Sequence, residues 1–154
     1  MIQTNYKTML KQAEGLTEDV NHKIANFANL SALLFTTLKD INWAGFYFFE
    51  GDTLILGPFQ GKVACVEIAN GRGVCGTAAI TDTTQLIPDV HKFPGHIACD
   101  AASRSEIVVP LHMDGKVIGV LDIDSASPDR FSEEDKEGLE ELGRMIDSWY
   151  KNWK

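Results

Sequence analysis

The sequence contains no long apolar run. No stretch of its 154 residues approaches the ~18 consecutive apolar residues that cross a bilayer. The first residues, 1–7, also lack the apolar core of a signal peptide. We therefore expect a cytoplasmic chain without a membrane partner.

Positive charge is scarce relative to negative charge. The chain has 14 Lys and Arg residues against 22 Asp and Glu residues, which gives a formal net charge of −8. Nucleic acids and anionic membranes attract clustered basic side chains. The charge balance therefore argues against both as partners, and it leaves the nature of a small substrate open.

Cysteine is rare and present in an odd number. Cys65, Cys75 and Cys99 are the three cysteines of the chain, whereas the disulfide framework of a secreted protein normally uses an even number. In a reducing cytosol, disulfides are usually transient and either catalytic or redox-sensing. Three buried, inert cysteines are the alternative.

The usual metal and cofactor motifs are also missing. No C-x-x-C or H-x-x-x-H pair is present, so no metal is expected. The glycine-rich segment 70–77 lacks the spacing of a P-loop or of a dinucleotide fingerprint, and no bound cofactor is expected. A protease-like nucleophile, Cys99 with His91 or His96, stays open, but their spacing does not set the geometry it needs.

Hydrophobic periodicity predicts helices at both ends of the chain. A first helix is expected at 4–14, ended by Gly15, and a second from an N-cap at Thr17, with Ile24 on its apolar stripe. A final helix is expected after a capping box at Ser132.

The middle of the chain predicts strands. We expect strands at 43–49, 53–56, 63–68 and 85–87, a loop at 57–61, a short helix at 74–80, an irregular segment at 88–105 and a hairpin at 107–123. This order predicts an α+β fold. A single domain over 1–154 should contain a largely antiparallel sheet, with the terminal helices packed on one face.

The predicted hairpin carries two carboxylates. Its Asp114-Gly115 turn is typical of type I′. Alternation on the return strand places Ile118, Val120, Asp122 and Asp124 on one face. The two aspartates would be costly to bury without partners, unless that end of the strand is simply hydrated.

An unbroken hairpin would keep Glu106 away from these aspartates. The two-residue turn pairs Met113 with Lys116, which places Glu106 opposite Ile123 and on the other face. A bulge would restore a shared face. Pro110, which cannot donate a ladder hydrogen bond, is a plausible position for it.

Thiol redox chemistry fits the cysteines and the irregular loop before Cys99. A thiolate attacks an electrophile, and a second cysteine resolves the oxidised first one. Chain entropy does not choose the partner, because a bridge from Cys99 to Cys65 would constrain the unfolded chain by about 3.8 kcal/mol and one to Cys75 by about 3.5 kcal/mol.

Six segments and the three-cysteine pattern carry a family resemblance. The segments are Trp43-Ala44-Gly45-Phe46-Tyr47, Gly57-Pro58-Phe59-Gln60-Gly61, Gly71-Arg72-Gly73-Val74-Cys75-Gly76, Val90 to Cys99, Ser105-Glu106-Ile107-Val108-Val109-Pro110 and Val120-Leu121-Asp122-Ile123-Asp124-Ser125. Over nearly its whole length the chain resembles the free methionine-(R)-sulfoxide reductases, single-domain enzymes of the GAF fold.

The resemblance implies a role for each cysteine. Cys99 is expected to attack the sulfoxide sulfur and to become a sulfenic acid as methionine leaves. Cys65 resembles the resolving cysteine that closes an intramolecular disulfide. Cys75 is expected to be dispensable or to take part in an alternative disulfide, and thioredoxin is the implied reductant.

The residues themselves suit this substrate. Free methionine sulfoxide carries an ammonium, a carboxylate, a polar S=O and a methyl group. Glu106, Asp122 and Asp124 could hold the ammonium and protonate the leaving oxygen, because crowded carboxylates raise one another's pKa. Trp43 and Tyr47 could enclose the methyl group.

A non-enzymatic GAF module that senses a small ligand is the rival prediction. Such modules usually lie beside an output domain, for which 154 residues leave no room. A possible homodimer through the terminal helices is a further expectation, motivated by the apolar stripe from Leu139 to Trp153.

Overall fold

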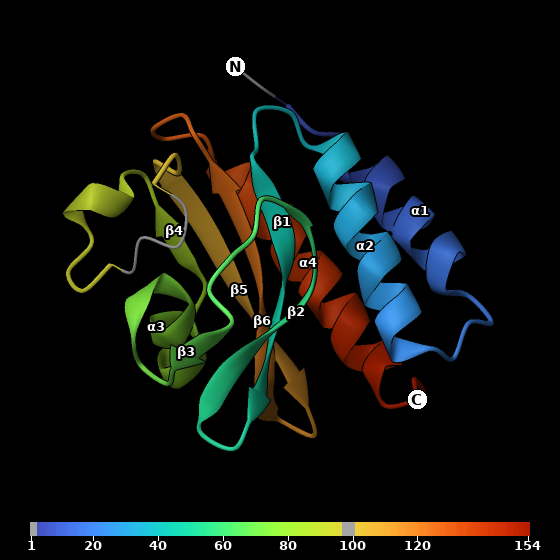
Figure 1. Ribbon diagram of the computed structural model, residues 1–154. Coiled ribbons are helices and arrows are strands. Elements are labelled where there is room, and N and C mark those ends of the chain that lie inside the picture. The colour runs from blue at the N-terminus through green and yellow to red at the C-terminus, as the bar shows by residue number, and fades with distance from the viewer. Residues whose placement is uncertain (1–2, 97–100) are drawn as a thin grey trace.

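A six-stranded antiparallel sheet forms the centre of the fold (Figure 1). The structure, a computed structural model, describes residues 3–96 and 101–154. Its strands are β1 (Trp43–Glu50), β2 (Thr53–Gly61), β3 (Glu67–Ala69), β4 (Gln85–Ile87), β5 (Ser105–Met113) and β6 (Lys116–Ser125). Their order is β3-β2-β1-β6-β5-β4, and all neighbouring pairs are antiparallel.

Helices cover the two faces of this sheet unequally. The helices α1 (Tyr6–Thr17), α2 (Lys23–Thr37) and α4 (Glu133–Tyr150) lie together on one face, and α3 (Gly73–Thr81) lies on the other (Figure 1). A short 3-10 helix, η1 (Val90–Lys92), follows β4. The predicted α+β fold is confirmed. Within the described ranges, no helix has the length and apolar character needed to span a membrane.

The sheet separates two hydrophobic clusters, as alternation along β1 requires. Ala44, Phe46 and Phe48 belong to the cluster under α1, α2 and α4. Trp43 and Tyr47 belong to the cluster under α3. The side chains of this aromatic strand are thus divided between the two faces of the sheet, and the candidate site lies on the α3 side.

The boundary between the first two helices was predicted wrongly. α1 does not end at Gly15 but continues to Thr17, whose hydroxyl donates to the carbonyl of Ala13 (3.0 Å). Thr17 thus ends one helix instead of capping the next, which begins at Lys23. Ile24, expected on the buried stripe, is 75% exposed. Glycine costs a helix only about 1 kcal/mol, and the buried residues on both sides of Gly15 outweigh this cost.

Two predictions around the second strand were also wrong. The expected loop around Pro58 is the second half of β2, where the β1–β2 ladder continues past a register shift between Gly45 and Tyr47. The strand expected at 63–68 shortens to β3, so that Cys65 lies in the connection before that strand. Proline lacks an N–H donor, and the local irregularity allows it within a strand.

The start of α4 was predicted correctly. Ser132 Oγ accepts from the Asp135 N–H, and the Asp135 carboxylate accepts from the Ser132 N–H (2.8 Å), which completes a capping box. Leu139, Leu142 and Ile146 of the predicted apolar stripe are buried in the cluster between α4 and the sheet. These three residues of the stripe therefore pack inside the chain's own core.

The β5–β6 hairpin contains both predicted backbone features. Asp114 and Gly115 have φ of 53° and 78°, as a type I′ turn requires. The register then shifts next to His112, which pairs with Val117, and the ladder passes over Ile118. This insertion of one residue is a β-bulge.

The bulge also changes which way one side chain points. Ile118 was expected to share a face with Val120 and Asp122, but it packs against the helix-side cluster. Val117 takes the position beside Val120 in the α3-side cluster. An extra residue reverses the alternation on one side of the bulge, which is why the simple two-residue period failed there.

His112 connects helices that lie on opposite faces of the sheet. Its Nε2 lies 2.6 Å from Asp82 at the end of α3, and its Nδ1 lies 2.8 Å from Asp147 on α4. Partial burial would lower the pKa of His112, but its hydrogen bonds to both aspartates and their negative charges raise it overall. The charged imidazolium donates one hydrogen bond to each of the two carboxylates.

Candidate functional site

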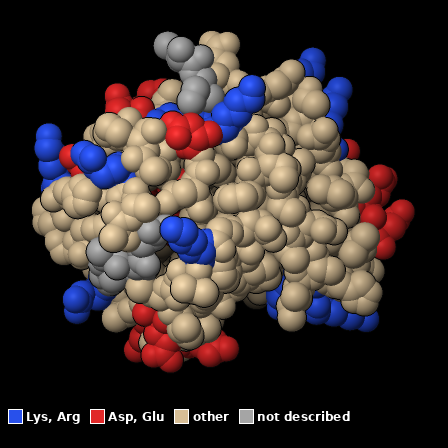
Figure 2. All heavy atoms as spheres, turned by 45° about the horizontal axis from the view of Figure 1, so that its top comes forward, with Lys and Arg blue, Asp and Glu red and all other residues tan. Residues whose placement is uncertain are grey.

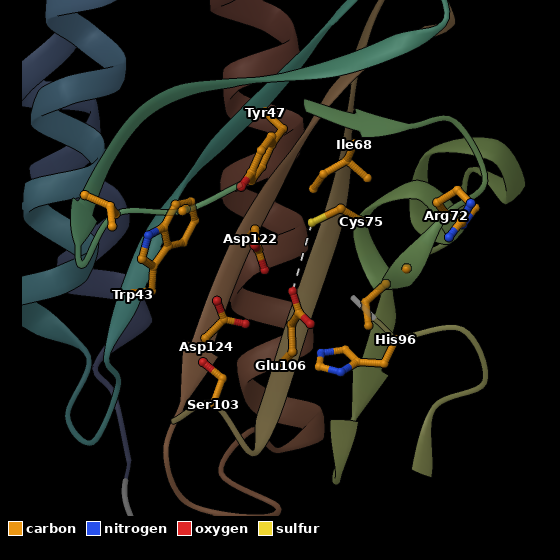
Figure 3. A pocket seen from close by; sticks show the side chains of 14 residues that line it. Trp43, Tyr47, Ile68, Arg72, Cys75, His96, Ser103, Glu106, Asp122 and Asp124 are labelled. Atoms are coloured by element: carbon orange, nitrogen blue, oxygen red, sulfur yellow. Dashed lines mark hydrogen bonds between the residues drawn. The ribbon is translucent and has the colours of Figure 1, made fainter. Parts of the chain in front are cut away.

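A cavity lies between α3 and the sheet, on the face opposite the other three helices (Figure 3). All five residues predicted to bind a substrate line it: Trp43, Tyr47, Glu106, Asp122 and Asp124. The remaining lining residues are Val63, Ala64, Ile68, Arg72, Gly73, Val74, Cys75, His96 and Ser103.

The β6 bulge brings three carboxylates to this cavity. Glu106 pairs with Asp124 across the β5–β6 ladder, and Asp122 lies two residues along the same strand face. The predicted bulge near Pro110 is thereby confirmed. Without it, Glu106 would oppose Ile123, whose side chain belongs to the helix-side core.

Glu106 is the proton-holding member of the cluster. Its side chain is buried, and burial raises the pKa of its carboxyl well above the usual 4.5. The negative charges of Asp122 and Asp124, and hydrogen bonds with both, raise this pKa further. The site therefore holds a carboxylic acid beside two carboxyl groups that can accept a hydrogen bond from it.

Asp122 offers an acceptor that has no partner. It is 5% exposed, and its Oδ1 makes no hydrogen bond within the described part of the chain. Burial raises the pKa of Asp122 overall, although hydrogen bonds from Glu106 and Cys75 partly offset this by favouring the ionised form. A buried, unpaired carboxylate oxygen costs free energy, so a cationic donor entering the cavity would be strongly stabilised.

Cys75 is a buried thiol beside this cluster. Its Sγ lies 4.0 Å from Oε2 of Glu106, and it is a free cysteine (Figure 3). Burial, followed by the charges of Asp122, Glu106 and Asp124, raises the pKa of the thiol well above 9. The neutral thiol is a poor nucleophile, so the site does not activate Cys75.

Cys75, together with Glu106 and Asp122, forms the only potential metal-ligand cluster among the described residues. Ligand atoms of Cys75, Glu106 and Asp122 lie within 4.8 Å of one another. Metal binding needs deprotonated ligands, so an ion here would have to displace the protons that the raised pKa values of Cys75 and Glu106 favour. An ammonium group needs only acceptors, and the unpaired Oδ1 of Asp122 offers one.

Aromatic rings form the wall facing the carboxylates (Figure 3). Trp43 stacks on Tyr47, with ring centroids 6.0 Å apart, and on Phe59, at 5.1 Å. Their polar ends bind the backbone of the connection before β3. The Tyr47 hydroxyl donates to the carbonyl of Cys65 (2.9 Å), and Trp43 Nε1 donates to the carbonyl of Lys62 (3.1 Å).

Two of the three cysteines are described by the structure. Cys65 is half-buried and disulfide-bonded, and its neighbours Val63 and Ala64 line the cavity. Cys99, the nucleophile expected from the family resemblance, lies outside the described residues. The thiol assignments thus stay predictions.

Some lining residues were not singled out from the sequence. Arg72 is the N-cap residue of α3, and the first N–H groups of that helix have no intrahelical partner. A helix start of this kind can hold an anion. Ile68 and Ser103 carried no sequence signal, because only the tertiary fold brings them to the cavity.

Figure 2 shows the charged side chains on one face of the molecule. Figure 2 shows Lys and Arg side chains dispersed on one face, among Asp and Glu side chains and broad uncharged areas. A continuous basic patch is absent from the part of this face that the structure describes.

Comparison with known proteins identifies close relatives. The family model of the GAF domain matches residues 16–147. The chain is 63% identical to the "Free methionine-R-sulfoxide reductase" of Escherichia coli, over 80% of this chain and 75% of the relative. It is 52% identical to the protein of the same name from Saccharomyces cerevisiae, over 90% and 81%.

A solved structure also matches almost the whole chain. The "structure of fRMsr of Staphylococcus aureus (complex with substrate)" superimposes with a TM-score of 0.91. The two proteins are 55% identical, and the match covers 96% of this chain and 97% of the other. The likeness extends to sequence, fold and length alike.

Proposed function

Because the chain belongs to the free methionine-R-sulfoxide reductases, enzymes of the GAF-domain family, we propose that it reduces free methionine (R)-sulfoxide through cysteine thiol chemistry. The observation that carries the proposal is the carboxylate cluster, in which Glu106 and Asp122 are buried and Asp124 is half-buried, facing an aromatic wall. It offers acceptors for an ammonium, a proton donor and an apolar surface within one small cavity.

Each part of the substrate has a matching group. The ammonium binds Asp122 and Asp124, where the unpaired Oδ1 of Asp122 accepts one of its N–H bonds. The methyl group lies against the rings of Trp43 and Tyr47, whose polar ends are already engaged elsewhere. The α-carboxylate binds the N–H groups at the start of α3.

The chemistry begins with Cys99 as the nucleophile. Its thiolate attacks the sulfoxide sulfur, and the oxygen receives a proton from Glu106, whose raised pKa keeps that proton available. The protonated oxygen then moves from the methionine sulfur to the Cys99 sulfur while the bond between the two sulfurs breaks, so that methionine leaves as the thioether and Cys99 becomes a sulfenic acid. The sulfoxide sulfur is reduced by two electrons and the cysteine sulfur is oxidised by two.

Cys65 resolves the sulfenic acid. Its thiolate attacks the Cys99 sulfur, the S–O bond breaks, and water leaves as the disulfide forms. Two observations support Cys65 over Cys75: Cys65 is disulfide-bonded, and Cys75 is a buried thiol whose raised pKa makes it unreactive. Cys75 therefore serves as a neutral hydrogen-bond donor to the acidic cluster.

An external dithiol must then reduce the disulfide. Thioredoxin is the proposed reductant and the cytoplasm the proposed location, because cytosolic thiol systems keep such disulfides transient. A homodimer through the terminal helices stays a prediction that light scattering tests. Since Leu139, Leu142 and Ile146 are buried within the chain, only the outer surfaces of these helices could form it.

Cysteine variants test the proposed function. Cys99→Ser should abolish reduction of the free (R)-sulfoxide. Cys65→Ser should release about one methionine per enzyme and then recycle poorly with thioredoxin, because chemistry precedes resolution. Cys75→Ser is the matched control and should turn over nearly normally, because it retains both cysteines of the proposed disulfide. A Cys75–Cys99 bridge in the oxidised protein, found by mass spectrometry, would contradict the assignment.

A sensing role without turnover is the second candidate. The same acidic and aromatic cavity would bind an amino acid whether or not a reaction follows. Assays with each sulfoxide epimer separate the two functions, since a sensor binds ligand without releasing methionine. Release from the (R) epimer alone supports the enzyme.

A further inference from the structure

The segment that carries Cys65 is held in place by the aromatic wall of the cavity. Between the end of β2 and Val66 the chain has no regular secondary structure. Trp43 Nε1 donates to the Lys62 carbonyl (3.1 Å), and the Tyr47 hydroxyl donates to the carbonyl of Cys65 itself (2.9 Å). Two rigid side chains of β1 thus fix the backbone on which this cysteine lies.

Both donors are themselves held firmly. Trp43 is 3% and Tyr47 is 2% exposed, and their rings stack on each other. Burial and the nearby charge of Asp122 raise the pKa of Tyr47, so its hydroxyl keeps its proton and can donate to the carbonyl throughout the working pH range. The two hydrogen bonds are thus available in every protonation state of the neighbouring acids.

We propose that Tyr47 and Trp43 are positioning residues for Cys65, which hold its sulfur where it closes the disulfide once methionine has left. The proposal rests on the proposed function, in which Cys65 is the resolving cysteine. Fixing one reactant shortens the search for productive geometry and raises the rate of an intramolecular step. The rings would thus enclose the substrate while their polar ends prepare the second step.

Closure of the disulfide, the step that these residues assist, needs no outside oxidant, because the sulfenic acid is already the oxidised partner. The Cys65 thiolate forms the S–S bond with the sulfenic sulfur, the S–O bond breaks, and the departing hydroxide takes a proton to become water. The hydrogen bond to the Cys65 carbonyl takes no part in this electron flow. Its contribution is geometric, so its loss should slow closure of the disulfide more than release of methionine.

The test compares two rates within a single turnover. Reduced enzyme is mixed with excess free methionine (R)-sulfoxide without a reductant. Methionine release and the loss of the Cys65 thiol are followed by rapid quench, alkylation and mass spectrometry. Tyr47→Phe keeps the ring and removes the hydroxyl, and Trp43→Phe keeps an aromatic ring and removes the N–H. Tyr150→Phe, which removes a hydroxyl at the end of α4 on the opposite face, is the matched control.

The measured quantity is the rate of disulfide closure divided by the rate of methionine release. It should fall about fivefold in each of the two site variants, the factor for one hydrogen bond, and stay unchanged in Tyr150→Phe. The sulfenic acid should accumulate correspondingly and be trapped by dimedone. An unchanged ratio in Tyr47→Phe and Trp43→Phe would overturn the proposal, and so would slower release with an equal slowing of closure. A wild type that forms no disulfide at Cys65 would overturn the proposed function instead.

Discussion

Replacing Glu106 by glutamine tests the electrostatics of the site most directly. Glutamine has nearly the shape of a protonated glutamic acid but cannot ionise. Because burial and the neighbouring aspartates raise the pKa of Glu106, the folded protein keeps a proton there that the unfolded chain releases above about pH 4.5. The substitution removes this difference and preserves the packing.

Linkage sets the sign and size of the effect. A carboxyl whose pKa is raised in the folded state contributes its stability fully below its unfolded pKa and loses it as the pH rises toward the folded value. While Glu106 stays protonated, the wild type loses about 1.4 kcal/mol of unfolding free energy per pH unit relative to Glu106→Gln. For a chain of this size, one pH unit shifts the difference in Tm by about 3–6 °C.

Thermal melting of both proteins over a series of pH values measures this difference. Asp114→Asn is the control, because it makes the same acid-to-amide change at an exposed turn position and should leave the pH dependence unaltered. If the difference in Tm between Glu106→Gln and the wild type stays constant between about pH 5 and 7, the assignment of a buried, protonated Glu106 is refuted. The stabilised variant should also lose activity about 100-fold or more, because it lacks the proton donor.

Three further substitutions test the scaffold. His112→Gln should lower the free energy of unfolding by about 1–3 kcal/mol near pH 6 and by less near pH 9, because a raised pKa confers stability that disappears as the imidazolium deprotonates; equal losses in urea titrations at both pH values would contradict this. Gly15→Ala should stabilise the protein by about 0.5–1 kcal/mol, since nothing lies within 4 Å of the added methyl group. Gly138→Ala should destabilise it despite the same gain in helix propensity, because the new Cβ would lie 2.3 Å from the ring of Tyr6; a higher Tm would show that the ring moves aside freely.

Local chemistry made several elements predictable from the sequence. The Asp114-Gly115 turn needs two positive φ values, and these two residues adopt them readily. Alternation along β1 follows from strand geometry alone, and the Ser132 capping box depends on residues three positions apart. Such features arise from neighbouring residues, so a sequence contains their causes.

The site required one long-range inference. Three carboxylates could share a face only if the hairpin contained a bulge, and the structure has one beside the predicted position. The shift of Ile118 to the helix side was not foreseen, because which residue a bulge displaces depends on packing against both clusters. The continuation of α1 past Gly15 has a similar origin, in contacts that outweigh local propensity.

The sequence by itself determined the residue types of the chemistry: thiols, carboxylates and aromatic rings in segments that form strands and turns. Only the tertiary structure decided their states. The raised pKa of Glu106 comes from burial and from carboxylates on another strand, and the Tyr47 hydroxyl finds its acceptor 18 residues away, at Cys65. Protonation and hydrogen-bond partners depend on distance and desolvation in space, and neighbours along the chain do not reveal either quantity.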